Sequence, residues 1–164
     1  RYKDMAFIRK VLPEDNQALA TVIRSVLIEL GVPKVGTAYA DPEVDNMFAT
    51  YDRARNAYFV VEKEGKILGG AGIAPLAGED PSICELQKMY FSPASRGLGL
   101  GKQMMDTCLA FAKENNYSLC YLETLPYMKA AQKLYLKSGF DYIDGPMGNT
   151  GHTSCNVWLT KSLL

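Results

Sequence analysis

The stretch "SRGLGLGKQ" (residues 95–103) places three glycines within five residues, between a segment with strand character and a segment with helix character. Glycine has no Cβ, so this density lets the backbone adopt left-handed turns and approach another group closely. The first N–H groups of a helix have no partner inside the helix and can bind an anion. The pattern Arg96-x-x-Gly99-x-Gly101 therefore predicts a loop that holds a phosphate or pyrophosphate group.

Two common nucleotide-binding motifs do not fit this loop. A Walker A loop needs Gly at position 96 and Ser or Thr at position 103, where the chain has Arg96 and Gln103. The dinucleotide pattern G-x-G-x-x-G can start at Gly97 but meets Lys102 where its third glycine belongs. A flexible turn that uses glycine only for positive φ is the plain alternative, so the neighbouring segments decide.

Hydrophobic periodicity divides the rest of the chain into strands and helices in the order βααβββαβαββ. Neither an internal repeat nor an interdomain linker is visible, and we expect a single domain over residues 1–164. A hairpin is expected between the second and third strands, across residues 64–65. Strands are expected at residues 5–12, 57–63, 66–76, 82–91, 118–125, 140–144 and 153–161, and helices at residues 14–30, after Asp41, at about 99–115 and from Met128 to Gly139.

Composition and charge exclude several classes of protein. The chain is 48% hydrophobic and 22% charged, as is typical of a globular domain, and it carries 18 basic and 18 acidic residues. This balance argues against a nucleic-acid partner, and four cysteines without a C-x-x-C pair and a single histidine predict no metal site. No apolar run approaches the roughly 20 residues of a membrane helix, and residues 1–4 lead into no apolar signal segment. We expect a cytoplasmic protein with no membrane partner.

Several segments around the glycine loop together resemble the core of the GNAT superfamily of N-acetyltransferases. They are Phe91-Ser92-Pro93 at a strand end, the loop from Arg96 to Gly101, the helix of residues 102–115, the strand of residues 119–123, and the pattern formed by Ala131, Leu134, Tyr135, Gly139 and Phe140. The resemblance implies an α/β (α+β) GNAT fold with a central mixed, mostly antiparallel sheet of six to seven strands. That sheet is splayed between its fourth and fifth strands and flanked by about four helices. The implied activity is acetyl-CoA-dependent transfer of an acetyl group to a primary amine, with a small polar molecule as acceptor.

By the same resemblance, acetyl-CoA enters the splay between the two strands. Backbone groups of Met89 and Phe91 then pair with the pantetheine arm, and the loop amides hold the pyrophosphate. Many relatives carry Asn where this chain has Met128, so Thr124 or the turn of residues 125–127 is expected to replace that contact. The full set of expected cofactor-binding residues is Met89, Phe91, Arg96, Gly97, Leu98, Gly99, Leu100, Gly101, Lys102, Thr124, Met128 and Ala131.

Transfer to an amine requires a base for the acceptor and an acid for the departing thiolate. An alkyl ammonium has a pKa of about 10 and must lose a proton before it attacks. Glu85 is the first candidate base because strand alternation places it on the same side as Met89 and Phe91, facing the splay, and Glu123 is the reserve. Tyr135 matches the family tyrosine that protonates the thiolate. A strand glutamate paired with a cation and a core tyrosine are the plain alternatives.

Two loops are expected to flank the entry of the acceptor amine. Residues 36–45 contribute Tyr39 and Asp41, and residues 145–152 contribute His152, the only histidine of the chain. Their polar character suits a small polar amine, and the second loop can instead border a homodimer contact. A strand-edge histidine with no special task is the plain alternative for His152. Two rival functions stay open, namely an acyl-CoA-binding sensor without turnover and an enzyme that uses the loop for ATP or NAD.

Overall fold

A seven-stranded sheet forms the middle layer of the computed structural model, which describes residues 5–164, and the N-terminal segment of residues 1–4 lies outside this part. The strands follow the order β1-β2-β3-β4-β5-β7-β6, and only β4 and β5 are parallel neighbours. The mixed, mostly antiparallel sheet that the resemblance implies is confirmed. The strands are β1 (Phe7–Lys10), β2 (Ala57–Lys63), β3 (Lys66–Pro75), β4 (Ile83–Phe91), β5 (Leu119–Thr124), β6 (Asp141–Ile143) and β7 (Val157–Ser162).

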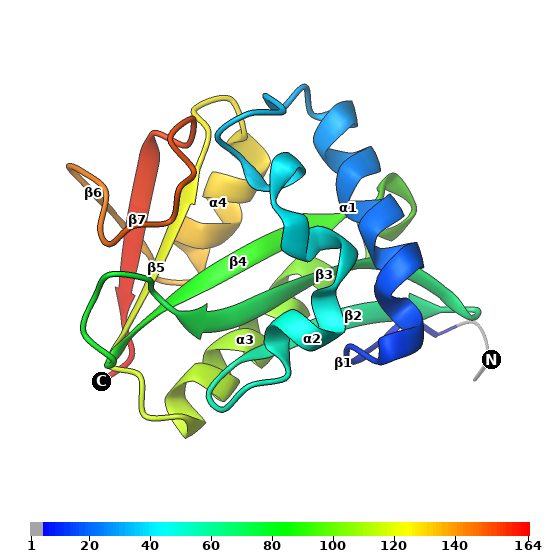
Figure 1. Ribbon diagram of the computed structural model, residues 1–164, viewed down its shortest axis with the longest axis horizontal. Coiled ribbons are helices and arrows are strands. Elements are labelled where there is room, and N and C mark those ends of the chain that lie inside the picture. The colour runs from blue at the N-terminus through cyan, green and yellow to red at the C-terminus, as the bar shows by residue number, and fades with distance from the viewer. Residues whose placement is uncertain (1–4) are drawn as a thin grey trace.

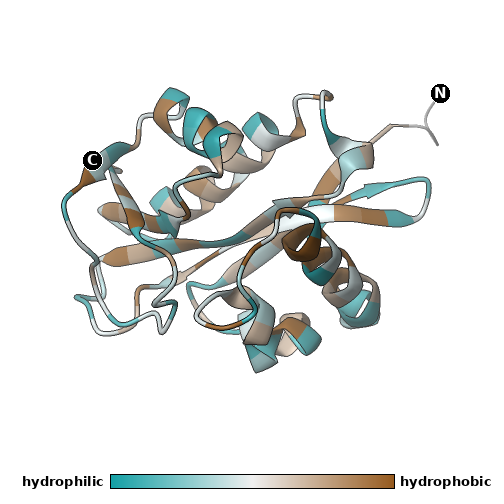
Figure 2. Cartoon of the chain, turned by 90° about the horizontal axis from the view of Figure 1, so that it is seen from above, coloured by the Kyte–Doolittle hydropathy of each residue, from teal (hydrophilic) through white to brown (hydrophobic). Residues whose placement is uncertain are grey.

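Helices cover both faces of the sheet, as Figure 2 shows with the sheet seen nearly edge-on. One core lies between the sheet and α1 and α2, and contains Leu19, Ile23 and Met47. The other lies beneath α3 and contains Met104, Met105 and Cys108. The helices are α1 (Asn16–Glu29), α2 (Met47–Tyr51), α3 (Leu100–Glu114) and α4 (Lys129–Lys137), with single 3-10 turns at Pro13–Asp15, Ala38–Ala40, Pro42–Asp45 and Pro93–Ser95.

The strands β4 and β5 separate shortly after they meet (Figure 1). They pair through only three residue pairs, the last of which joins Glu85 to Tyr121. Just after the end of β4, Ser92 N–H donates to the Leu68 carbonyl of β3 (2.8 Å). Backbone groups of alternate residues point to opposite sides of a strand, so those of Met89 and Phe91 point toward the gap. The expected splay is therefore present, and the backbone groups of Met89 and Phe91, which the resemblance names, face it.

A bulge interrupts β4 at Lys88. Its backbone has a φ of 49°, in the left-handed region that non-glycine residues rarely adopt. The register with β3 shifts here, because Gly72 pairs with Gln87 whereas Gly70 pairs with Tyr90. Three residues of β4 thus span the distance that two residues of β3 cover.

The bulge makes the expected side-chain alternation along β4 wrong. Met89 and Phe91 pack against the core beneath α3, whereas Tyr90 packs against the core beneath α1. Glu85, before the bulge, lies on the side of α1 and α2, because its neighbour Leu86 belongs to the α3 core. Glu85 therefore does not share a face with Met89 and Phe91, and its place at the splay follows from its position at the last β4–β5 pair.

The single helix expected after Asp41 is also wrong. Residues 42–45 form a 3-10 turn, and Asn46 (φ −138°, ψ 46°) separates it from α2. Asp41 makes no side-chain capping bond; its carboxylate instead contacts His152. No helix in residues 5–164 has both the length and the apolar character needed to cross a membrane.

Candidate active site

The glycine loop enters α3 through two left-handed residues. Gly97 has a φ of 80° and Gly99, which precedes the first residue of α3, has a φ of 71°. A Cβ at either position would meet no atom within 4 Å, so backbone conformation is what requires glycine here. A Cβ on Gly101 would lie 3.2 Å from the Leu134 side chain, so this glycine lets α3 approach α4 closely.

The loop amides are available for an anion. Within the described chain, the first N–H after Arg96 to find a backbone acceptor is that of Gln103, which donates to the Gly99 carbonyl (3.3 Å). The N–H groups of residues 97–102 precede it, at the end where the helix dipole is positive. This arrangement can hold a diphosphate without any side chain.

The two cations beside the loop are already paired. The Arg96 guanidinium binds both carboxylate oxygens of Glu29 (2.6 and 3.0 Å) and also donates to the Phe91 carbonyl (3.0 Å). Lys102 is exposed and pairs with Asp106 one turn along α3 (2.8 Å). Within the described residues, the groups of this loop that have no partner are therefore the main-chain N–H groups of residues 97–102 and not the two cations.

A largely apolar cavity of about 400 Å³ opens between β4 and α4, with the C-terminal end of α1 on its third side. It contains most of the cofactor residues expected from outside the loop. The cavity extends from Arg96, at the loop, to Tyr135. The expected residues that line it are Met89, Phe91, Arg96, Met128, Ala131 and Tyr135.

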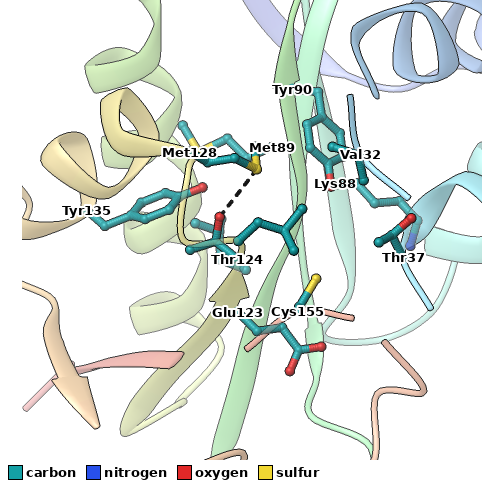
Figure 3. A pocket seen from close by; sticks show the side chains of 12 residues that line it. Val32, Thr37, Lys88, Met89, Tyr90, Glu123, Thr124, Met128, Tyr135 and Cys155 are labelled. Atoms are coloured by element: carbon teal, nitrogen blue, oxygen red, sulfur yellow. Dashed lines mark hydrogen bonds between the residues drawn. The ribbon is translucent and has the colours of Figure 1, made fainter. Parts of the chain in front are cut away.

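A second, smaller and less open cavity of about 40 Å³ lies deeper in the splay and shares Tyr135 with the first (Figure 3). Figure 3 shows the Tyr135 hydroxyl directed into the gap between the two strands. No hydrogen bond to this hydroxyl occurs within residues 5–164, and burial raises the pKa of Tyr135 to about 12. The phenol is therefore protonated at neutral pH and can donate. The other lining residues that matter below are Thr37, Lys88, Glu123, Thr124 and Cys155.

Glu85 is buried, with 6% of its surface exposed, and is not among the residues that line this cavity. Gln87 Nε2 donates to its Oε1 atom (2.7 Å), and the Tyr51 hydroxyl donates to Gln87 Oε1 (2.6 Å). Burial raises the pKa of Glu85 to about 7; the bond from Gln87 opposes this shift and the charge of Glu123 adds to it. A carboxyl group with this pKa can exchange a proton near neutral pH.

Glu123 borders the cavity directly and is held by several partners. The Tyr121 hydroxyl donates to Oε2 (2.7 Å), and the Thr150 hydroxyl donates to Oε1. His152 Nδ1 lies 3.6 Å from the same Oε1 atom. Of the two carboxylates, Glu123 is thus closer to the cavity and Glu85 has fewer partners.

The two loops expected at the acceptor entry meet over these carboxylates. His152 Nε2 lies 2.7 Å from Asp41 Oδ2, and this hydrogen bond raises the pKa of His152 although burial opposes the shift. Ser154 N–H also donates to the Gly36 carbonyl (3.0 Å). Asp41, His152 and Glu123 therefore lie together.

Tyr39 lies away from this cluster. Its ring faces the Lys34 ammonium (5.2 Å from the ring centre) and the Arg24 guanidinium (5.9 Å). The sequence interpretation also missed Lys88 and the pair formed by Gln87 and Tyr51. A lysine within the otherwise apolar end of a strand is the signal that points to Lys88.

Cysteine and metal chemistry have little support in this site. Burial raises the pKa of Cys155 to about 12, and the nearby charge of Glu123 adds to this, so its thiol is protonated at neutral pH. A protonated thiol is a weak nucleophile. The other three cysteines are buried, and residues 5–164 contain no cluster of three His, Cys, Asp or Glu side chains suited to a metal ion.

Comparisons with known proteins agree on one family. The chain is 45% identical over 157 residues to an Escherichia coli (strain K12) protein named "Uncharacterized N-acetyltransferase YjgM". The match covers 95% of this chain and 94% of that protein. A GNAT-family acetyltransferase structure from Staphylococcus aureus Mu50 matches with a TM-score of 0.86 at 22% identity, over 98% of this chain and all of that one.

The structure of yncA from Salmonella typhimurium, solved with acetyl-CoA, matches with a TM-score of 0.77 at 18% identity, over 97% of this chain and 94% of that one. At this level of identity the two solved structures support the fold. The family model for the acetyltransferase (GNAT) family matches residues 26–140, and the chain belongs to this family.

Proposed function

We propose that this protein is an acetyl-CoA-dependent N-acetyltransferase that transfers the acetyl group directly to the primary amine of a small polar molecule. The observation that carries the proposal is the alignment of three features along the β4–β5 splay. Amides without acceptors lie at one end, an apolar cavity follows, and the Tyr135 hydroxyl and two buried carboxylates lie at the other.

The chain fits acetyl-CoA on the geometry of these features. When bound, acetyl-CoA supplies a thioester as the acetyl donor. The N–H groups of residues 97–102 would hold its diphosphate at the positive end of α3. Backbone groups of Met89 and Phe91 point into the gap where the pantetheine arm would lie, and the Phe91 carbonyl already accepts a bond from Arg96. The structure of yncA, which has the same fold, was solved with acetyl-CoA, and this supports acetyl-CoA as the ligand.

Tyr135 would act as the acid. Its hydroxyl faces the gap, where the two cavities meet, and it is protonated at neutral pH. The thiol produced has a pKa near 8.5, like that of cysteine, so a nearby proton donor speeds its departure.

Glu85 would act as the base, through a water molecule in the small cavity. Its pKa of about 7 suits proton transfer at neutral pH, and it has a single hydrogen-bond partner within residues 5–164. Glu123, at the cavity wall, would contact the incoming ammonium and would keep the pKa of Glu85 raised through its charge.

Proton balance follows from these roles. The ammonium gives one proton to Glu85, and the neutral nitrogen attacks the thioester carbonyl carbon. The new C–N bond forms as the C–S bond breaks, and Tyr135 protonates the departing sulfur. The nitrogen then loses its second proton, which restores the Tyr135 hydroxyl. The products are an amide, a free thiol and one proton released from Glu85 to solvent.

The test combines ligand binding with turnover. The midpoint of thermal unfolding is measured with acetyl-CoA, CoA, ATP or NAD to identify the ligand. A ligand at 100 times its Kd stabilises the folded protein against unfolding by about 2.7 kcal/mol. Thiol release from acetyl-CoA is then measured over a panel of primary amines. We expect stabilisation by acetyl-CoA and CoA, and thiol release with at least one amine.

The variant Tyr135→Phe should lower kcat by about 10²- to 10⁴-fold while acetyl-CoA affinity stays the same. Tyr142→Phe is the matched control, because Tyr142 is exposed and its hydroxyl bonds to Gln132 outside the site. Stabilisation by ATP or NAD but not by CoA would refute the proposal. CoA binding without thiol release from any amine would identify a sensor instead.

A further inference from the structure

Lys88 is a buried cation whose position the proposed reaction does not explain. Its side chain is 5% exposed, and it lines the same small cavity as Tyr135 and Glu123. The bulge of β4 holds its backbone at positive φ, so the strand departs from regular geometry where this lysine occurs.

The Lys88 ammonium has only loose partners. Its Nζ atom lies 3.6 Å from Glu43 Oε1 and 3.8 Å from Asp41 Oδ2, beyond hydrogen-bond distance. Asp41 is instead bonded to His152 at 2.7 Å, and Glu43 is partly exposed. Within residues 5–164 the three N–H donors of this ammonium therefore make no hydrogen bond, which is costly for a buried charge.

The positive side chain of Lys88 and the negative side chain of Glu123 lie at different sides of the small cavity. Figure 3 shows Lys88 and Thr37 on one side, with Tyr135 and Thr124 on the other and Glu123 below them. An acceptor ammonium near Tyr135 and Glu123 would therefore leave its other end toward Lys88. A buried lysine repels a purely cationic acceptor, but it attracts an acceptor that also carries an anion.

We propose that the acceptor is an amino acid, whose carboxylate binds Lys88 while its amine lies between Glu123 and Tyr135. This inference rests on the proposed function and specifies its substrate class. A carboxylate would supply the close partner that Asp41 and Glu43 do not supply. The cavity of about 40 Å³ has room for roughly two or three water-sized groups, fewer than the five backbone heavy atoms of an amino acid, so binding requires the side chains that line it to move apart.

The experiment compares each amino acid with the amine that lacks only its carboxylate. Suitable pairs are serine with ethanolamine, tyrosine with tyramine, and lysine with cadaverine. Thiol release gives kcat/KM for both members of each pair. We expect kcat/KM for at least one amino acid to exceed that for its amine by about 10- to 150-fold, the range of a charged hydrogen bond worth about 1.5–3 kcal/mol.

The variants Lys88→Met and Lys88→Arg identify the residue responsible. Lys88→Met should abolish the preference within that pair, mainly through KM for the amino acid, and Lys88→Arg should keep part of it. Stabilisation by acetyl-CoA in both variants reports that they fold. The wild-type comparison also stands alone if Lys88→Met does not fold.

Two outcomes overturn the inference while the proposed function survives. In one outcome, kcat/KM for each amine is equal to or higher than kcat/KM for the matched amino acid. The other is a preference for the amino acid that Lys88→Met leaves unchanged. The absence of transfer to every compound in the panel would overturn both the inference and the proposed function.

Discussion

The two ends of the β4–β5 splay are built in different ways. At the loop end, the available groups are main-chain amides from one continuous stretch, residues 97–102. At the other end they are charged side chains from β4, β5 and two loops, and Asp41 and His152, which are in contact, are 111 residues apart in sequence. The loop end thus depends on local backbone conformation, whereas the acceptor end depends on the tertiary fold.

The largest expected effect comes from breaking the acceptor end at Glu85. Glu85→Gln should lower kcat by about 10²- to 10⁴-fold, because it removes the proposed base and keeps the shape. A base must be deprotonated, so wild-type kcat/KM should rise with pH through the pKa of about 7. That inflection should disappear in the variant.

Glu123→Gln is the matched control for this pH profile. It removes a charge that raises the pKa of Glu85, so the inflection should remain but move to lower pH. An inflection near 7 that persists in Glu85→Gln and vanishes in Glu123→Gln would assign the base to Glu123.

A smaller effect is expected from straining the loop end at Gly99. Gly99→Ala should weaken acetyl-CoA binding by about 10-fold, because a side chain in the left-handed region costs about 1–2 kcal/mol and the loop relaxes away from its binding shape. Isothermal titration calorimetry measures the change.

Gly65→Ala is the matched control for the backbone strain. Gly65, in the β2–β3 hairpin, has a φ of 75° and equally open surroundings. The variant Gly65→Ala should lose about as much folding stability as Gly99→Ala and keep wild-type affinity for acetyl-CoA. Equal affinity in both variants would contradict a role for the loop conformation.

The smallest effect is expected at Lys102. Because this lysine is exposed and paired with Asp106, Lys102→Ala should change acetyl-CoA affinity by no more than about 2- or 3-fold. A loss comparable to that of Gly99→Ala would mean that side-chain charge, rather than main-chain N–H groups, dominates at the loop end.

The same contrast explains what the sequence could predict. The loop and the helix that follows it are visible in the sequence because three glycines and the start of a helical pattern are local signals. The bulge at Lys88 gives no such signal, since lysine has no preference for positive φ and the surrounding sheet imposes that conformation.

Asp41 illustrates the second limit. Its sequence context, before Pro42 and Glu43, is typical of a residue that caps a helix. In the fold, its carboxylate is instead hydrogen-bonded to His152, which is far away in sequence. Strand alternation selected Glu85 on a premise that the bulge overturns, and Glu85 lies at the splay because it belongs to the last β4–β5 pair. The contact between His152 and Asp41 and the place of Lys88 at the small cavity required the folded structure.

The most direct test of the loop end is hydrogen exchange of individual amides, measured by NMR with and without saturating CoA. If the main chain holds the diphosphate, exchange should slow at residues 97–102 and stay unchanged at Gly65. Unchanged exchange at residues 97–102, in a sample that thermal unfolding shows to be fully bound, would contradict main-chain binding of the cofactor.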